Sequence, residues 1–265
     1  MDLTGKTALV TGASSGIGTQ FARLLADRGA DLILTARREL RLEALAHELR
    51  RDKQVKVDVV VADLATPTGA AELFARTEGA GRRVDVLINN AGAGAFARFL
   101  ELDWQTTHRQ LQLNVVSATE LAYRFGQSMR DRKQGWILNV ASVAGYSPMP
   151  GYATYAAGKT YVLNFSFALA QELRSSGVVV GCLSPGLTQS EFHQVARHSL
   201  PSAAGLIAMS AEDTAIRGLD GLFEGQANVI PGWINKLGAF FLKLLPGRVG
   251  AAMTALVGPK DTSQH

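Results

Sequence analysis

The chain has 265 residues, of which 47% are hydrophobic and 19% are charged, and it contains one cysteine. The hydrophobic share excludes a disordered chain, and the length suits one large α/β domain. The single cysteine excludes a disulfide scaffold and a cysteine-based zinc site, and it fits a reducing compartment. The formal net charge is only +4, so the charge does not favour nucleic acid as a partner. We also expect no metal site.

The N-terminal sequence enters an apolar run almost at once, which leaves no room for a signal peptide. No apolar run reaches the roughly 18 residues that a membrane-spanning helix needs. We therefore expect a cytoplasmic protein that is soluble or at most attached to a membrane surface.

Short, continuously apolar runs alternate with longer helical patterns along the chain. Continuous apolar runs are typical of parallel strands that helices cover on both faces. The pattern predicts strands at residues 6–11, 31–36, 56–62, 84–89, 136–141, 178–183 and 227–230. It predicts helices at residues 17–28, 39–51, 68–77, 104–133 and 154–175. This alternation indicates a doubly wound α/β fold of the Rossmann type, with a mainly parallel seven-stranded sheet and helices on both faces.

We expect one Rossmann-type domain over residues 1–232, an amphipathic basic extension over 233–257 and a disordered tail over 258–265. Residues 187–209 are loosely patterned, which predicts a lid over a site. His193 and His198 are five apart, so they do not share a helix face for a metal, and we assign them to the lid surface. The apolar residues around the lid favour a largely apolar substrate: Phe192, Leu200, Leu206, Ile207 and Met209, with Met149 and Pro150.

A glycine-rich turn connects the first predicted strand to the first predicted helix. It places backbone N–H groups and the positive end of a helix dipole at one point, which suits a pyrophosphate. We expect Gly12 to permit the tight turn, Gly16 to allow the backbone to approach the phosphate, and Gly18 to allow close helix–strand packing. Taken alone, the turn leaves a purely structural role open. The candidate cofactor residues here are Gly12, Ser14, Ser15, Gly16, Ile17 and Gly18.

The end of the second predicted strand favours NADP(H) over NAD(H). Ala36 offers no carboxylate for the ribose hydroxyls, whereas the guanidinium groups of Arg37 and Arg38 can pair with a 2′-phosphate. The alternative is that both arginines only begin a solvated helix. After the third strand, Asp63 can accept a hydrogen bond from the adenine amino group or can serve as a helix N-terminal residue. We assign Leu64 to the same part of the cofactor site.

Polar residues follow the fourth and fifth predicted strands, in Asn89-Asn90-Ala91-Gly92 and in Ala141-Ser142. Ligands in open α/β sheets bind beyond the carboxyl ends of the strands, so these residues should share a crevice with the glycine turn. Tyr155 and Lys159 are four apart on a predicted helix and share a face. We expect the lysine ammonium to lower the tyrosine pKa from about 10, so that the phenol can act as acid and base near neutral pH.

Together these motifs closely resemble the short-chain dehydrogenase/reductase family, in its single-domain form, over residues 5–232. The resemblance implies that Ser142, Tyr155 and Lys159 are catalytic, and that Lys159 also binds the nicotinamide ribose. It implies that Asn114 is catalytic too and helps hold a water that links the lysine to solvent. The remaining cofactor contacts implied by the family, besides Tyr155 and Lys159, are Asn90, Ala91, Gly92, Pro185, Gly186 and Thr188.

The same resemblance implies hydride transfer between NADPH and a carbonyl carbon, with Tyr155 giving a proton to the oxygen and Ser142 stabilising it. The substrate is then a lipophilic ketone or its alcohol, such as a 3-oxoacyl thioester, a steroid-like ketone or another apolar ketone. A non-catalytic NADP(H)-sensing protein on the same fold is the alternative. Family members are often dimers or tetramers joined through the long helices, here 104–133 and 154–175.

Residues 233–245 predict an amphipathic basic helix that ends at Pro246-Gly247. Its apolar positions recur at helical spacing, and Lys236 and Lys243 share another face. The apolar face could cover the substrate crevice or a partner subunit. The other interpretation is a helix that lies on a membrane surface and takes up a lipophilic substrate there.

Overall fold

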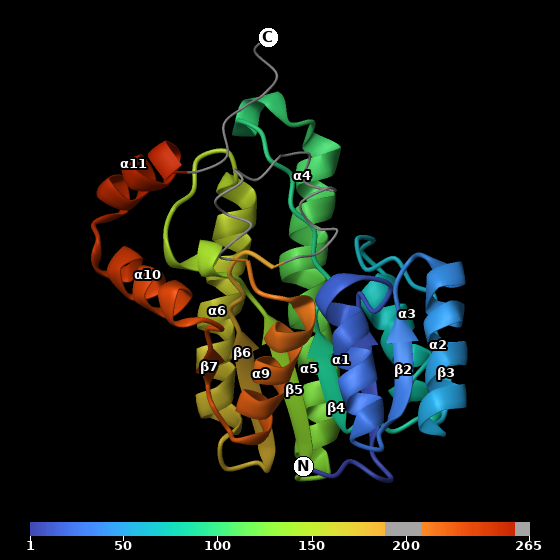
Figure 1. Cartoon of the computed structure of the whole chain (residues 1–265). Helices are drawn as coiled ribbons and strands as arrows, with labels where there is room; N and C mark the ends of the chain where they lie inside the picture. Colours follow the sequence, from blue (N-terminus) through green and yellow to red (C-terminus); the bar gives the residue numbers. More distant parts are fainter. Residues whose placement is uncertain (189–207, 258–265) are drawn as a thin grey trace.

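Seven parallel strands form one sheet in the order β3-β2-β1-β4-β5-β6-β7 (Figure 1). The computed structural model describes residues 1–188 and 208–257. The order runs outward from β1 in both directions, which is the doubly wound arrangement that the sequence predicts. The strands are β1 (Thr7–Thr11), β2 (Asp31–Thr35), β3 (Val57–Val59), β4 (Val86–Asn89), β5 (Gly135–Val140), β6 (Val178–Leu183) and β7 (Asn228–Val229).

The central strands are apolar on both sides because helices cover both faces of the sheet. Ala8, Leu9 and Val10 of β1 are all fully buried. Strand β3 is shorter than the predicted 56–62, although Val60 and Ala62 still donate backbone hydrogen bonds to Leu34 and Ala36. The chain therefore continues beside β2 without regular strand geometry, and the carboxyl ends of the strands remain at one edge.

One face of the sheet carries three helices, α1 (Gly16–Asp27), α2 (Glu39–Lys53) and α9 (Ala211–Phe223). Apolar side chains from these helices join those of β1 and β2 in the larger core cluster. The opposite face carries α3 (Gly69–Ala75), α5 (Ala118–Asp131) and α6 (Ala153–Leu173), which pack around a second cluster. Helix α9 was not among the predicted helices. Short 3-10 turns lie at Glu78–Ala80, Phe99–Glu101 and Val143–Tyr146.

The predicted helix over 104–133 is interrupted by a π-helical turn. Helix α4 (Trp104–Leu111) begins where Asp103 accepts a hydrogen bond from the backbone N–H of Thr106 at 2.8 Å. The π-helical turn spans Gln112–Ser117 and leads directly into α5. It contains Asn114, and such turns occur frequently at functional sites.

Two further helices, α10 (Trp233–Leu244) and α11 (Gly247–Val257), follow β7 and lie at the left of Figure 1. Helix α10 ends before Pro246, as predicted, whereas α11 was not among the predicted helices. Among the described residues, no helix is both long and apolar enough to cross a bilayer.

Candidate active site

The glycine turn after β1 requires glycine at three positions. Gly12 and Gly16 have φ angles of +67° and +57°, a backbone region that disfavours other residues. A Cβ atom on Gly18 would lie 2.2 Å from the carbonyl oxygen of Gly12, so no side chain fits there. The turn is thus held tightly against the first residues of α1, which leaves its backbone open to a ligand.

The N-terminus of α1 suits an anion. Its N-cap residue, Ser15, makes no side-chain capping hydrogen bond, and its first turn contains no acidic residue. The Arg38 guanidinium donates hydrogen bonds to the hydroxyl of Ser14 at 3.1 Å and to that of Ser15 at 2.6 Å. A positive charge and an uncapped helix N-terminus therefore lie together, which fits a dinucleotide phosphate. Arg37, beside them, is exposed.

Asp63 is held in place by two donors. One carboxylate oxygen accepts from the backbone N–H of Ala65 at 3.0 Å, and the other accepts from Arg109 of α4 at 2.6 Å. Burial alone would raise the pKa of Asp63, but these hydrogen bonds and the charges of Arg109 and Arg37 lower it overall. The expectation that Asp63 could be a helix N-terminal residue is wrong, because α3 begins only at Gly69. The neighbouring Leu64 is buried.

The loop after β4 touches both parts of the site. Asn90 donates from its amide to the carbonyl oxygen of Thr11 at 2.9 Å, and the backbone N–H groups of Asn90 and Ala91 donate to the Thr11 hydroxyl. Two residues further on, a Cβ atom on Gly92 would lie 3.2 Å from Asn114 Oδ1 and 3.4 Å from Lys159 Nζ. This loop therefore connects the glycine turn to the lysine.

Ser142, Tyr155 and Lys159 lie together at the end of β5 and the start of α6. Ser142 accepts a hydrogen bond from the backbone N–H of Ala144 at 3.2 Å and is also hydrogen-bonded to Tyr155. Lys159 is only 4% exposed, and its ammonium donates to the carbonyl oxygen of Val140 at 2.7 Å. The same nitrogen lies 5.7 Å from the centre of the Tyr155 ring. The three side chains that the motif predicts are thus brought together.

The pKa values of this pair differ from the expectation. Burial raises the pKa of Tyr155 to about 12, against a lowering by the hydrogen bond with Ser142. Burial lowers the pKa of Lys159 to about 8. The prediction that Lys159 acidifies Tyr155 is therefore wrong for this structure. Burial of the phenol dominates its pKa, and the Lys159 ammonium is engaged with the carbonyl oxygen of Val140.

Asn114 is buried in the π-helical turn and binds the backbone of Ala93 with both ends of its amide. Its Oδ1 accepts from the Ala93 N–H at 3.0 Å, and its Nδ2 donates to the Ala93 carbonyl oxygen at 2.7 Å. The side chain therefore fixes the loop that follows Gly92.

The segment after β6 closes another side of the site. The Pro185 carbonyl oxygen accepts from the backbone N–H of Val143 at 2.9 Å, and the Thr188 hydroxyl donates to the carbonyl oxygen of Gly186 at 3.2 Å. Thr188 also forms an isolated parallel bridge with Met209. Most of the predicted lid lies outside the described residues, with Phe192, His193, His198, Leu200, Leu206 and Ile207, and so does the predicted tail 258–265.

The sequence did not point to several residues beside the site. A Cβ atom on Gly186 would lie 2.4 Å from the amide of Asn235, so the first turn of α10 packs on this segment. The Tyr152 ring lies 5.7 Å from that of Tyr155 and 5.0 Å from that of Phe96. Two signals in the sequence could have identified them. Asn235 is a polar residue within an apolar helix, and Tyr152 is an aromatic residue three positions before Tyr155.

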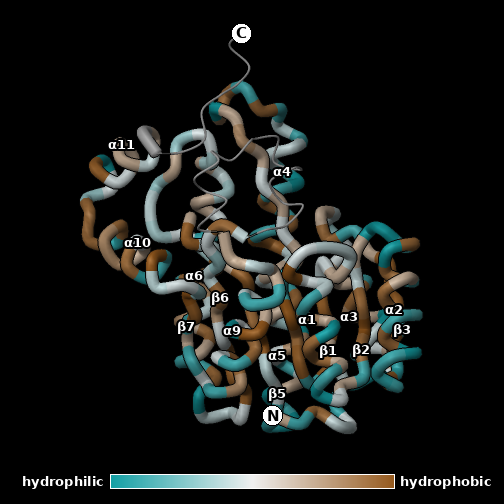
Figure 2. The backbone as a smooth tube through the Cα atoms, viewed as in Figure 1, coloured by the Kyte–Doolittle hydropathy of each residue, from teal (hydrophilic) through white to brown (hydrophobic). Residues whose placement is uncertain are grey.

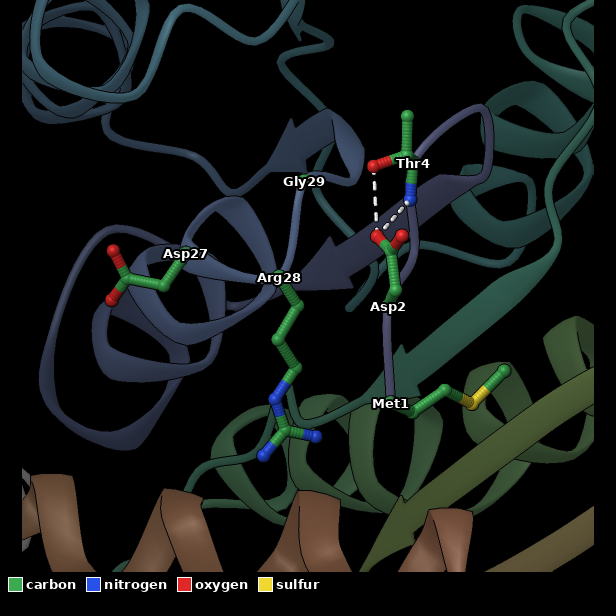
Figure 3. Close-up of a pocket in the computed structure, with 6 residues that line it drawn as sticks. All are labelled: Met1, Asp2, Thr4, Asp27, Arg28 and Gly29. Carbon is green, nitrogen blue, oxygen red and sulfur yellow. Dashed lines mark hydrogen bonds between the residues drawn. The ribbon is translucent and has the colours of Figure 1, made fainter.

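A separate hollow of about 390 Å³ lies at the opposite end of the sheet, beside the N-terminus (Figure 3). Arg28 and Asp27 come from the end of α1, and Asp2 is engaged with Thr4 through two hydrogen bonds. None of the predicted site residues lies there. The residues that line it are Met1, Asp2, Thr4, Asp27, Arg28 and Gly29.

Comparison with known proteins agrees with this geometry. The family model described as short chain dehydrogenase matches residues 6–200. Nodulation protein G of Rhizobium sp. (strain N33) is 37% identical over 192 residues, which cover 71% of this chain and 76% of the relative. The chain therefore belongs to the short-chain dehydrogenase family and is an oxidoreductase.

Two solved structures are similar over nearly the whole chain. A short-chain dehydrogenase from Sphingobium yanoikuyae in complex with NADPH has a TM-score of 0.81 and 31% identity, and the match covers 98% of each chain. A 7beta-hydroxysteroid dehydrogenase has a TM-score of 0.87 and 27% identity, with 96% of this chain and 100% of that one covered. Both matches extend over α10 and α11 or most of them.

Proposed function

We propose that the protein is an NADP(H)-dependent oxidoreductase that interconverts a lipophilic ketone and a secondary alcohol. The observation that carries this proposal is the loop Asn90-Ala91-Gly92. It is hydrogen-bonded to Thr11 of the glycine turn at one end and faces Asn114 and Lys159 at the other. One short loop thus contacts both the glycine turn, which would bind the phosphates, and Lys159, which would take part in proton transfer.

The residues around the turn would hold the dinucleotide. The α1 N-terminus and the backbone of the turn would bind its pyrophosphate, and Arg38, with Arg37 beside it, would pair with the 2′-phosphate. Asp63 and Leu64 would lie at the adenine, whereas Pro185, Gly186 and Thr188 would lie at the nicotinamide. When bound, NADPH would supply the hydride for the carbonyl carbon.

Tyr155 would act as the proton donor to the carbonyl oxygen. With a pKa of about 12, the phenol is protonated at neutral pH, which suits reduction of a ketone. Ser142 would donate a hydrogen bond to the same oxygen. The Lys159 ammonium would hold the ribose and would restore the proton to Tyr155 through the ribose hydroxyl, and Asn114 would position the loop beside it.

The surroundings of Tyr155 support an apolar substrate. Tyr152 and Phe96 form a row of aromatic rings beside the tyrosine, and Met149 and Pro150 lie in the preceding loop. The 7beta-hydroxysteroid dehydrogenase among the similar structures acts on one such class. Steroid-like ketones, 3-oxoacyl thioesters and other apolar ketones are the classes to be tried.

We also propose a cytoplasmic homo-oligomer. The outer faces of the π-helical turn, α5 and α6 expose Val116, Tyr123 and Tyr161, which suits pairing through the long helices. The single cysteine, Cys182, is a buried thiol, in keeping with a reducing compartment. The contact of residues 233–257 with a membrane is a separate proposal on a different surface.

The experiment is NADPH oxidation, followed at 340 nm, with a panel of steroid, 3-oxoacyl and small aryl ketones. The proposal expects turnover with at least one apolar ketone, and faster turnover with NADPH than with NADH. Arg38→Ala and Arg37→Ala should weaken the binding of NADPH much more than the binding of NADH. NADPH that binds but is not oxidised with any ketone would instead favour a non-catalytic sensor.

A further inference from the structure

Helix α10 directs its largest apolar side chains away from the protein. Trp233, Leu237, Phe240 and Leu244 follow one another at helical spacing and form a single stripe. They are 74%, 49%, 59% and 65% exposed, and the neighbouring Phe241 is 57% exposed. An apolar face covering the crevice of the same chain, one of the interpretations of the sequence, is therefore wrong for the described residues.

The opposite side of α10 contains Asn235, Ala239 and the partly buried Leu242, and it packs on the protein. Ala239 is 2% exposed, and Asn235 donates to the carbonyl oxygen of Pro231 at 2.7 Å while lying against Gly186. The helix is thus held by its less apolar face. In Figure 2, the brown colour that marks hydrophobic residues is visible in α10 and in the turn before α11, at the outer edge of the molecule.

Helix α11 has the same arrangement. Its buried side contains Gly250 and Thr254, and the Thr254 hydroxyl donates to the carbonyl oxygen of Pro148 at 2.7 Å. Its outer side contains Val249 and Met253, which are 45% and 47% exposed. The exposed apolar residues of α10 and of the outer side of α11 are here called the α10–α11 surface.

The charge of this surface has one sign. Lys236, Lys243 and Arg248 are all exposed, and none of the residues 225–260 is Asp or Glu. Exposed aromatic residues flanked only by basic ones are typical of helices that lie in the interface of an anionic bilayer. We propose that the α10–α11 surface docks on the anionic phospholipid headgroups of a membrane.

A second copy of this chain fits the surface less well. Two-fold pairing through α10 and α11 would place the basic side chains of both copies in one interface, and neither helix contains an acidic residue to pair with them. An anionic bilayer instead pairs each cation and buries the aromatic rings at once. Charge complementarity therefore selects the lipid surface.

Helix α11 contacts the loop before Tyr155 with the side that faces the protein. Helix α11 is anchored to Pro148, and a Cβ atom on Gly250 would lie 2.5 Å from the Ser147 hydroxyl, both in the loop that leads to Tyr155. A molecule dissolved in the bilayer would therefore be close to this loop. That link to the substrate rests on the proposed function, whereas the docking itself does not.

The test is cosedimentation of the full chain with sucrose-loaded vesicles of phosphatidylcholine alone or of phosphatidylcholine and phosphatidylglycerol in a 3:1 ratio. The wild type should bind the anionic vesicles at least tenfold more strongly, and this binding should weaken as salt is raised. Phe240→Ser with Phe241→Ser should reduce binding at least tenfold, and Lys236→Gln with Lys243→Gln by roughly thirtyfold.

Matched controls remove the same groups elsewhere. Trp104→Ala removes a 67% exposed tryptophan from α4 and serves as the control for the loss of exposed aromatic side chains. Lys56→Gln with Lys133→Gln removes two exposed charges from the opposite end of the sheet. Both controls should bind as the wild type does, and none of these variants should change NADPH oxidation with a water-soluble ketone.

Three results would overturn the proposal. The first is no binding to anionic vesicles by a folded wild type, and the second is equal loss of binding in the lysine variant and its control. The third is a lipid-free oligomer that becomes monomeric in Phe240→Ser with Phe241→Ser, which would make the surface an interface between copies. Because oxidation of a water-soluble ketone is followed separately, failure of docking is distinguishable from failure of the proposed function.

Discussion

The candidate active site, at the carboxyl ends of the strands, and the α10–α11 surface distribute polar and apolar groups in opposite ways. At the site, Lys159 and Asn114 are buried and each is hydrogen-bonded to backbone, so polar groups are enclosed. On α10, Trp233 and Phe240 are exposed while the alanine is buried. Enclosed polar groups are arranged for a small ligand, whereas exposed apolar groups are arranged for a large partner.

The largest expected effect belongs to the phenol at the site. Tyr155→Phe removes the proton donor but keeps the ring, so ketone reduction should fall about a thousandfold. The comparison requires that binding to anionic vesicles does not change in this variant. Steady-state oxidation of NADPH and NADPH fluorescence titration would measure activity and cofactor binding. Retained turnover in Tyr155→Phe would remove the role assigned to the hydroxyl.

Next in size is the effect of adding one methyl group in the glycine turn. Gly18→Ala places a Cβ atom against the Gly12 carbonyl oxygen, so the free energy of unfolding should fall by about 1–3 kcal/mol. Cofactor binding should weaken with it, because the turn must move. Urea unfolding and isothermal titration with NADPH would measure both. Unaltered values would show that α1 moves away from β1 without cost.

The pH dependence of reduction should follow Lys159. Its pKa is lowered to about 8, so the ammonium is present below that pH and is lost above it. Tyr155 remains protonated throughout this range because its pKa is about 12. The rate of ketone reduction should therefore be level below pH 8 and fall by up to tenfold per pH unit above it.

Lys159→Arg is the control for that assignment. A guanidinium stays charged to above pH 12, so the variant should show no fall between pH 8 and 10, whatever its absolute rate. An unchanged fall in Lys159→Arg would assign the titration to another group.

The smallest effect is expected on the outer side of α10. Phe240→Ser should change the free energy of unfolding by less than about 0.5 kcal/mol, because the ring is already exposed. Ala239→Phe, one position away, should cost about 1–3 kcal/mol because that residue is buried. Urea unfolding of the two variants measures the contrast. Equal costs would mean that Phe240 packs on something in solution.

Most of the sheet could be predicted from the sequence, since parallel strands covered on both faces leave continuous apolar runs. The need for glycine at positions 12 and 18 was also predictable, because a left-handed turn and a close approach leave few other choices of residue. The ends of strands were harder to predict, as in β3. Residues that continue beside a neighbouring strand without regular strand geometry are as apolar as the strand itself, so the sequence does not separate the two.

Other features depend on contacts that periodicity does not contain. The spacing of apolar residues in α10 identified a face, but not that the face points outward, which packing of Asn235 on Gly186 decides. Helix α11 contains two glycines and is held by the contact of Thr254 with Pro148. The expected acidification of Tyr155 failed because burial, which the motif does not reveal, dominates its pKa.

The central claim is hydride transfer from NADPH to a ketone at this site, and the most direct test follows a deuterium label. NADPH carrying deuterium at C4, in each of its two configurations, would be incubated with an apolar ketone that the enzyme consumes, and the alcohol would be examined by mass spectrometry and NMR. The account predicts deuterium on the carbinol carbon from one of the two configurations. An alcohol without deuterium from either would contradict hydride transfer at this site.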